Sequence, residues 1–389
     1  MKLVVIGVGQ CGGRIADEFA RLNKRARIGR GIEIVTSVHA INTDTADLSG
    51  LRTIKTDYEH RIIVGGGKTG GHGVGKINEI GAEIVKEDAD KVIDAIRSAP
   101  RFAESDAFLL IAGAAGGTGS GGIAALTQRI RDRHVDKPVY NLIVLPFEHE
   151  ERTEERTIYN TATCLKSVDS VADAIFLVDN QRYVRKDFSL INNITKINSF
   201  IAEPFYNLLC SGEEKKAKHI GARLLDAGDI MQTVVGWTLV GYGQSSLPMI
   251  RLPFKKAWNF RNKSDEIYKG IQAMEGALSE LSAMCNPADA GRALYLLSAP
   301  AKEMNMDLVK TLGDRFKEFA PNAVIRNGDY PRGGGVDVTV ILSELADVEK
   351  VRKYYRQSAS LMREGPKKHD EAESKLSGMQ DAAQDVPSL

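Results

Sequence analysis

Three glycines near the start of the chain have a spacing that suits phosphate binding. The stretch "GVGQCGG" (7–13) places Gly7, Gly9 and Gly12 between an apolar run and a helical pattern. Glycine allows a tight turn there, and the free N–H groups at a helix N-terminus bind anions. Taken alone, the motif fits a dinucleotide site, in which Asp44 would bind the ribose although it follows the motif at more than the usual spacing. Close packing of strand and helix is the alternative explanation for the glycines.

A second glycine-rich stretch, "GAAGGTGSGG" (113–122), also lies between an apolar run and a helical pattern. Its backbone N–H groups form a second anion site, and Thr118 and Ser120 add hydroxyls that can donate to phosphate or help to hold Mg²⁺. A dehydrogenase needs only one such loop for its pyrophosphate. Two loops that converge from two strands therefore predict a nucleoside di- or triphosphate.

A third stretch, "VGGGKTGGHGVG" (64–75), contains the letters GKT but fails the Walker P-loop pattern. That motif requires a glycine where this chain has Ile62. We interpret the stretch as a glycine loop that orders on a ligand, and we do not expect Lys68 to hold phosphates as a Walker lysine does.

The stretch "DAGDI" (226–230) supplies a pair of carboxylates. Asp226 and Asp229 are three residues apart, so on one helical turn both would share a face. Aspartates also cap helix starts, and the residues by themselves leave both interpretations open.

The first half of the chain alternates apolar strands with amphipathic helices, which predicts a doubly wound parallel sheet. Strands are expected at 2–8, 31–44, 106–113, 138–147 and 172–180, and helices at 12–25, 75–99 and 122–134. Parallel strands place the loops that follow them along one edge of the sheet, so the glycine loops should meet there. The apolar stripe of 187–212 predicts one long helix, kinked or broken at Pro204.

The second half has a different pattern, which predicts an α+β domain with a mixed sheet. Strands are expected at 233–243, 247–254, 293–299, 323–328 and 336–345, with helices near 263–283, 305–319 and 346–360. The expected organisation is a nucleotide-binding domain over 1–186, a central helix over 187–212, a loop over 213–229, an α+β domain over 230–362 and a polar, disordered tail over 363–389.

Composition narrows the class of protein. The 389 residues carry 52 Lys and Arg against 51 Asp and Glu, so no excess charge favours nucleic acid or a membrane surface. The four cysteines are scattered, without metal-ligand spacing, and fit a reducing compartment. No apolar run is long enough to cross a bilayer. We expect a cytoplasmic protein that binds no resident structural metal, nucleic acid or membrane directly.

Several motifs together resemble the tubulin/FtsZ superfamily: "GQCGG" near the N-terminus, "NTD" after the second strand, "GGTGSG" (116–121), and a long helix leading to an acidic loop. "GDYPRGGG" and "LLDAGDI" are most similar to the archaeal tubulin-like CetZ group. The resemblance covers roughly residues 1–360 and is strongest over the first 245. It implies a Rossmann-like GTPase domain, a long central helix, a C-terminal α+β domain, and GTP or GDP with Mg²⁺ as ligands.

The resemblance also implies roles for individual residues. The α- and β-phosphates would contact Gly9, Gln10, Cys11, Gly12, Gly13 and Arg14, and the second loop would cradle the phosphates with Gly116, Gly117, Thr118 and Gly119. Asn42 and Asp44 would lie near phosphate or Mg²⁺, and Gly71, Gly73 and Gly75 near the γ-phosphate. Asn180 and Asn198 would read the guanine edge, because a carboxamide offers a donor and an acceptor; an exposed helical asparagine is the alternative for Asn198.

Two sites depart from the family pattern. Counting back from Asn180 places the ribose-binding acid at Thr153, so a neighbour, Glu151 or Glu154, is expected to take that role; a solvated charge run is the alternative. In the family the acidic loop reaches the nucleotide of the next subunit, which would make Asp226 and Asp229 the catalytic pair. FtsZ proteins usually have an asparagine where this chain has Leu224.

The resemblance implies a GTP-binding and GTP-hydrolysing cytoskeletal protein that polymerises head to tail with itself, with cell shape as its expected role. The alternatives are an FtsZ-type division filament, a nucleotide-binding adaptor that does not hydrolyse GTP and acts through unidentified partner proteins, and an NAD-dependent oxidoreductase. Cys11 lies beside the phosphate-binding amides, which could lower its pKa, but the absence of a histidine near it in the sequence favours a structural cysteine over a nucleophile.

Overall fold

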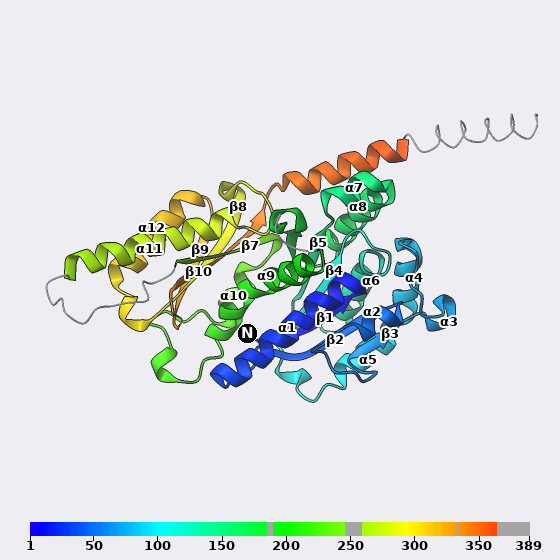
Figure 1. Cartoon of the computed structure of the whole chain (residues 1–389), viewed down its shortest axis with the longest axis horizontal. Helices are drawn as coiled ribbons and strands as arrows, with labels where there is room; N and C mark the ends of the chain where they lie inside the picture. Colours follow the sequence, from blue (N-terminus) through cyan, green and yellow to red (C-terminus); the bar gives the residue numbers. More distant parts are fainter. Residues whose placement is uncertain (185–189, 246–258, 333, 364–389) are drawn as a thin grey trace, which may run out of the picture.

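A computed structural model of the chain describes residues 1–184, 190–245, 259–332 and 334–363. Figure 1 shows two halves placed side by side, the blue-to-cyan N-terminal half and the yellow-to-orange C-terminal half, with the green helix α9 (Leu190–Ser211) between them. One sheet runs through both halves in the strand order β3-β2-β1-β4-β5-β6-β7-β10-β8-β9.

The N-terminal part of the sheet is parallel throughout. Its strands are β3 (Arg61–Ile63), β2 (Val35–Asn42), β1 (Leu3–Val8), β4 (Ala107–Gly113), β5 (Val139–Leu145) and β6 (Ala174–Asp179). Most are continuous apolar runs because helices bury them on both faces. The parallel, doubly wound domain expected from the sequence is confirmed, with an additional short strand, β3, at its edge.

Two helical layers cover this sheet. The face that carries Val5 and Leu109 packs on α1 (Gly9–Arg30), α9 and α10 (Ala227–Thr233). The opposite face packs on α4 (Asn78–Glu87), α5 (Ala89–Arg97), α6 (Thr118–Arg133) and α8 (Glu155–Asp169). Two short helices, α2 (Thr45–Ser49) and α3 (Gly66–Thr69), lie in the segment between β2 and α4, and α7 (Glu148–Thr153) follows β5.

The C-terminal part of the sheet is mixed, as expected. Strand β7 (Gly236–Ser245) continues the parallel order through β6, and β10 (Val336–Leu345) runs antiparallel to β7 and to β8 (Ala290–Ala299). Strand β9 (Val324–Pro331) is parallel to β8 at the edge. Helices α11 (Asn259–Ser279) and α12 (Met306–Phe319) complete this half, and a last helix over 349–363 lies beside α7 and α8 (Figure 1).

Several expected elements differ in detail. The helix expected at 75–99 is two helices, because the chain breaks at Asp88, whose carboxylate accepts a hydrogen bond from the Gly65 N–H at 2.8 Å. Helix α8 and the short helices were not foreseen. Pro204 lies inside a continuous α9. The strand expected at 247–254 and nearly all of the tail expected at 363–389 lie outside the described residues, and the domain boundaries remain predictions. In the described part of the chain, every helix is too short or too polar to cross a membrane.

Candidate functional site

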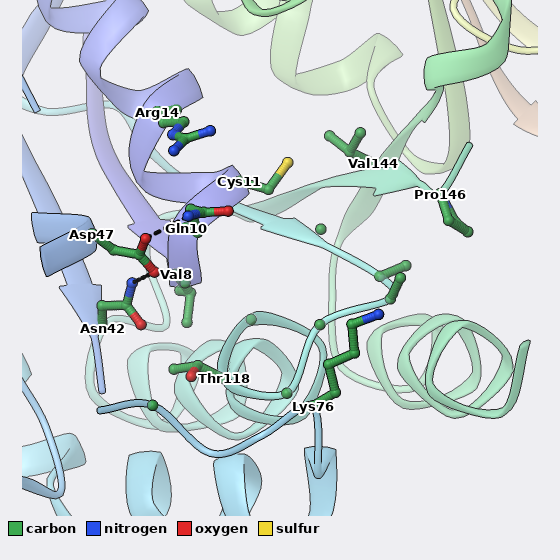
Figure 2. A pocket seen from close by; sticks show the side chains of 18 of the residues that line it. Val8, Gln10, Cys11, Arg14, Asn42, Asp47, Lys76, Thr118, Val144 and Pro146 are labelled. Atoms are coloured by element: carbon green, nitrogen blue, oxygen red, sulfur yellow. Dashed lines mark hydrogen bonds between the residues drawn. The ribbon is translucent and has the colours of Figure 1, made fainter. Parts of the chain in front are cut away.

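A cavity of about 440 Å³ opens at the carboxyl ends of β1, β4 and β5, where Val8, Gly113 and Leu145 line it. Both glycine loops face this one cavity (Figure 2). The convergence expected from the parallel sheet is therefore present. The expected site residues that line the cavity are Gly9, Gln10, Cys11, Arg14, Asn42, Asp44, Gly73, Gly75, Gly116, Gly117, Thr118, Gly119, Asn180 and Asn198.

The first loop offers the N-terminus of α1 to the cavity. Helix α1 begins at Gly9, and its N-cap residue Val8 gives no side-chain hydrogen bond, so the first N–H groups are available to an anion. Gly12 and Gly13 lie behind this turn and do not line the cavity. A Cβ atom on Gly12 would lie 2.0 Å from the carbonyl oxygen of Ile111, so Gly12 serves the packing of helix on strand.

The second loop offers the N-terminus of α6, which likewise lacks a side-chain cap. Gly116 faces open space, and a Cβ atom on Gly119 would lie 2.8 Å from the Val8 carbonyl oxygen, so the two loops approach closely. The Thr118 hydroxyl is 2.6 Å from that of Thr43. The Ser120 hydroxyl donates to the Gly116 carbonyl and does not line the cavity, so the expectation that it contacts phosphate is not met.

Two acidic residues after β2 line the cavity. Asp44 caps α2, its Oδ1 accepting from the Ala46 N–H at 2.8 Å. Asp47, which the sequence did not single out, accepts hydrogen bonds from the side chains of Gln10 and Asn42 (Figure 2). These contacts fasten the start of α1 to the end of β2 and keep an oxygen-rich patch at the cavity wall.

The loop over 71–77 closes another side of the cavity with His72, Gly73, Val74, Gly75 and Lys76. Gly71 is not in the lining: a Cβ atom there would lie 3.0 Å from Thr45, so this glycine packs on α2. Lys68 also lies outside the lining, and its Nζ pairs with Glu83 at 2.8 Å and Glu87 at 2.7 Å. This placement agrees with the rejection of a Walker role for Lys68.

The segments after β5 and β6 and helix α9 add carboxamides and apolar side chains to the cavity lining. Asn180 follows β6, and Asn198 on α9 is buried, with 9% of its surface exposed, so the alternative of an exposed helical asparagine is wrong. Ile194 and Ile197 on α9 and Phe147 after β5 add apolar surface beside these carboxamides. Apolar faces around a few fixed donors and acceptors are typical of sites that bind a base.

The charged stretch after β5 places its acids in three different settings. Glu150 lines the cavity, and its Oε2 accepts from the Phe147 N–H at 2.9 Å. Glu151 is not in the lining, because its carboxylate accepts a hydrogen bond from the Tyr354 hydroxyl of the last helix. Glu154 is also outside the lining and pairs with Lys76 at 2.5 Å. The structure therefore brings neither expected ribose residue into the cavity and places Glu150 there.

Cys11 lines the cavity as a neutral thiol. Burial raises its pKa to about 12; the negative charge of Glu150 adds to this, and Arg14 opposes it. A thiol that stays protonated at neutral pH is a poor nucleophile, which agrees with the structural interpretation of this cysteine.

The acidic pair lies at the opposite edge of the sheet. Strand β7 pairs with β6 in parallel through Ala174 and Gly236, so α10, which precedes β7, lies at the amino ends of the strands. The length of β6 separates that edge from the cavity, roughly 20 Å for six residues. Asp226 and Asp229 cannot reach the cavity of their own chain.

Comparison with known proteins fits this geometry. The model of the tubulin/FtsZ family GTPase domain matches residues 2–186, and the model of the C-terminal domain of tubulin-like CetZ matches 187–360. The tubulin-like protein CetZ1 of Haloferax volcanii is 30% identical over 370 residues, with 91% of this chain and 90% of that protein covered. The chain belongs to the CetZ group of the tubulin/FtsZ family.

Solved CetZ structures have the same fold. CetZ1 from Haloferax volcanii, described as a GDP-bound monomer, superposes with a TM-score of 0.78 at 28% identity, covering 93% of this chain and 100% of that one. CetZ2 from the same organism, described as a GTPγS-bound protofilament, gives 0.81 at 26% identity and covers 94% and 100%. The CetZ of Pyrococcus abyssi is 28% identical over 98% of this chain and 97% of its own length.

Proposed function

We propose that this protein binds guanine nucleotide, hydrolyses GTP and polymerises head to tail into protofilaments. The observation that carries the proposal is that the cavity and the acidic pair lie at opposite edges of the sheet. Support comes from one cavity lined by two uncapped helix N-termini, which suit a polyphosphate, together with the carboxamides of Asn180 and the buried Asn198. The solved structures of two relatives, a GDP-bound CetZ1 and a GTPγS-bound CetZ2 protofilament, support the same ligand and assembly.

In the proposed complex, Asn180 and Asn198 hydrogen-bond the guanine edge, while Phe147, Ile194 and Ile197 contact its faces. Glu150 takes the ribose, because it is the acid of this stretch that lines the cavity. Glu151 and Glu154, which the sequence suggested for this role, lie outside the cavity lining.

The phosphates lie on the N-termini of α1 and α6, with the N–H groups of the segments 9–11 and 116–118 as donors. Mg²⁺ prefers oxygen ligands and keeps several waters, and the carboxylates of Asp44 and Asp47 offer such oxygens on the cavity wall. When bound, Mg²⁺ supplies charge neutralisation on the phosphates. Gly12, Gly13 and Gly71 contribute through packing.

Hydrolysis is completed by a second subunit. A water oxygen attacks the γ-phosphorus, the bond to the β–γ bridging oxygen breaks, and the proton of that water leaves to solvent or to a carboxylate. The carboxylates that orient the water are Asp226 and Asp229 of the next subunit, because those of the same chain lie at the other edge of the sheet. Such a heterologous contact repeats without closing and so builds a filament.

One observation favours a second candidate, a nucleotide-binding adaptor without hydrolysis. Leu224 stands where FtsZ proteins usually have an asparagine, and 44% of its surface is exposed beside the acidic pair. A leucine cannot hydrogen-bond a water or a phosphate. We favour the hydrolysing filament, with a role in cell shape, because both acids are present. An FtsZ-type division filament shares this chemistry, and an NAD-dependent oxidoreductase leaves the second glycine loop without a role.

The test is GTP turnover measured together with light scattering on the purified full-length protein. We expect scattering to rise on addition of GTP and Mg²⁺, with phosphate release that follows it. Guanosine nucleotide binding without phosphate release would favour the adaptor. Binding of NAD in place of GTP would contradict the proposal.

A further inference from the structure

The glycine-rich loop that lines one side of the cavity also contributes a lysine. Lys76 lies near the end of the loop 71–77 and lines the cavity, on the side where Figure 2 also shows Thr118. Arg14 and Lys76 are the permanent cations among the described residues that line the cavity, and Asp44, Asp47 and Glu150 are the carboxylates of that lining. A polyphosphate that binds there needs cations, and Lys76 is one of two side chains that can always supply charge.

The backbone at Lys76 is held in a conformation that side chains rarely adopt. Its φ angle is 61°, in the left-handed region that favours glycine, as at the preceding Gly75 with φ 56°. Its carbonyl accepts a hydrogen bond from Asn160 Nδ2 at 2.9 Å, and the same nitrogen bonds the carbonyls of Ala115 and Gly116 at 3.0 and 3.1 Å. Asn160 thus fastens the lysine loop to the second phosphate loop and fixes where the side chain starts.

The ammonium group of Lys76 pairs with a partner that lies outside the cavity. Its Nζ is 2.5 Å from Glu154 Oε2, and the two side chains are 47% and 41% exposed. An exposed ion pair between flexible side chains is weak, since water screens it. A terminal phosphate carries more negative charge than one carboxylate and accepts strong hydrogen bonds from an ammonium group. It can therefore displace Glu154 as the partner.

We propose that Lys76 is a specificity-determining residue that distinguishes a nucleoside triphosphate from a diphosphate by exchanging Glu154 for the terminal phosphate. The inference rests on the proposed nucleotide function of this cavity. With the base on Asn180 and Asn198 as proposed, the phosphate chain would extend over the two glycine loops to the loop 71–77, which lines the same cavity. A diphosphate is one phosphate shorter, which leaves Lys76 with Glu154.

The exchange also links the terminal phosphate to α8. Beside the lysine, Glu79 on α4 pairs with Arg156 on α8, and Asn78 Nδ2 donates to Thr163 Oγ1 at 2.8 Å. The Lys76–Glu154 pair is a further bridge between the same two regions, and its lysine lines the cavity. Triphosphate binding would open this bridge while the other contacts hold.

The test measures the dissociation constants of GTPγS and GDP by calorimetry with Mg²⁺, at protein concentrations below assembly, for wild type and three variants. Lys76→Gln should weaken GTPγS binding roughly tenfold, the loss of one charge-assisted hydrogen bond, and change GDP binding less than twofold. Glu154→Gln should strengthen GTPγS binding, because the lysine no longer has a competing partner. Lys68→Gln, which removes a lysine that pairs outside the cavity, should leave the ratio of the two constants unchanged.

The outcomes separate the two proposals. Wild-type protein that binds neither nucleotide would overturn the proposed function itself. Wild-type binding with an unchanged GTPγS-to-GDP ratio in Lys76→Gln would overturn the lysine's role alone, and so would unchanged or weaker GTPγS binding by Glu154→Gln. Should Lys76→Gln fold poorly, the salt dependence of wild-type binding serves instead: GTPγS affinity should fall more steeply with salt than GDP affinity, and equal slopes would contradict the exchange.

Discussion

Arg326 Nε lies 3.3 Å from Asp229 Oδ1, so strand β9 of the C-terminal half holds one carboxylate of the acidic pair. The other member, Asp226, accepts a hydrogen bond from the Asp229 N–H at 2.8 Å and caps α10. The two aspartates therefore have different settings. Asp226 caps the start of the helix, whereas the carboxylate of Asp229, in the first turn, forms an ion pair with Arg326.

Replacement of Asp229 by alanine should leave GTP binding and assembly in place and lower phosphate release about 100-fold or more, since the variant lacks a group that positions the attacking water. Phosphate release and sedimentation, measured on the same samples, check this. Asp94→Ala, an exposed position on α5, is the matched control. Normal hydrolysis by the Asp229 variant would remove this residue from the mechanism.

Replacement of Arg326 by glutamine should lower turnover in assembled protein roughly tenfold, because Asp229 loses the charge that orients its carboxylate. Arg326→Lys keeps the charge and should recover part of the rate. The comparison is made at saturating GTP, where a change of kcat separates positioning from nucleotide affinity. Equal rates for wild type and Arg326→Gln would mean that the contact has no part in hydrolysis.

Glycines of the site should respond to substitution according to their surroundings. Gly12→Ala should lower the free energy of unfolding by about 1–3 kcal/mol, because its methyl group would meet the Ile111 carbonyl at 2.0 Å. Gly29→Ala, also within α1 but facing open space, should instead stabilise the protein by about 0.5–1 kcal/mol. Urea unfolding measures both, and equal effects would contradict the packing role of Gly12.

Acid should loosen the loop that carries the acidic pair. Burial alone would raise the pKa of Glu214, but hydrogen bonds from the Lys216 N–H, Arg332 and Tyr330 outweigh it and lower the pKa to about 2. A depressed pKa means that the unfolded chain binds more protons, so this contribution to stability is present above about pH 4.5 and is lost as the pH falls toward 2.

Between pH 5 and 2, the thermal unfolding temperature should therefore fall less steeply for Glu214→Gln than for wild type as the pH is lowered. Tyr330→Phe, which removes one of the donors to Glu214, should lie between them. Parallel curves for wild type and Glu214→Gln would contradict the assignment. A variant that is less stable at pH 7 and similar at pH 2 is the expected pattern.

The sequence predicted the features that depend on local pattern. Buried parallel strands form apolar runs, and loops that follow such strands lie along one edge of the sheet, so the meeting of both glycine loops at one cavity was predicted correctly. The three acids that follow β5 were not distinguished from one another. Glu150, Glu151 and Glu154 look alike in sequence, and only the folded partners, such as Tyr354 from a helix 203 residues away, separate them.

The same reason explains the other residues that the sequence did not reveal. Asp47 is held in the site by a hydrogen bond from Gln10, 37 residues away. Lys76 is held there by its left-handed backbone conformation and by its ion pair with Glu154. The break at Asp88 interrupts a continuous apolar stripe, and the Asp88 carboxylate there accepts a hydrogen bond from the distant Gly65 N–H. One feature could have been recognised in the sequence: a lysine directly after a glycine-rich loop, which the structure places in the cavity lining.

The most direct test of the split site mixes two variants that are inactive for different reasons. Gly116→Leu fills open space in the cavity and should block nucleotide binding, while Asp229→Ala binds nucleotide but lacks the acid. In a head-to-tail copolymer, the nucleotide of one variant meets the intact acid of the other. We predict that the equimolar mixture recovers about a quarter of wild-type turnover, from random pairing. A mixture that sediments together but stays as inactive as the double variant would contradict the shared active site.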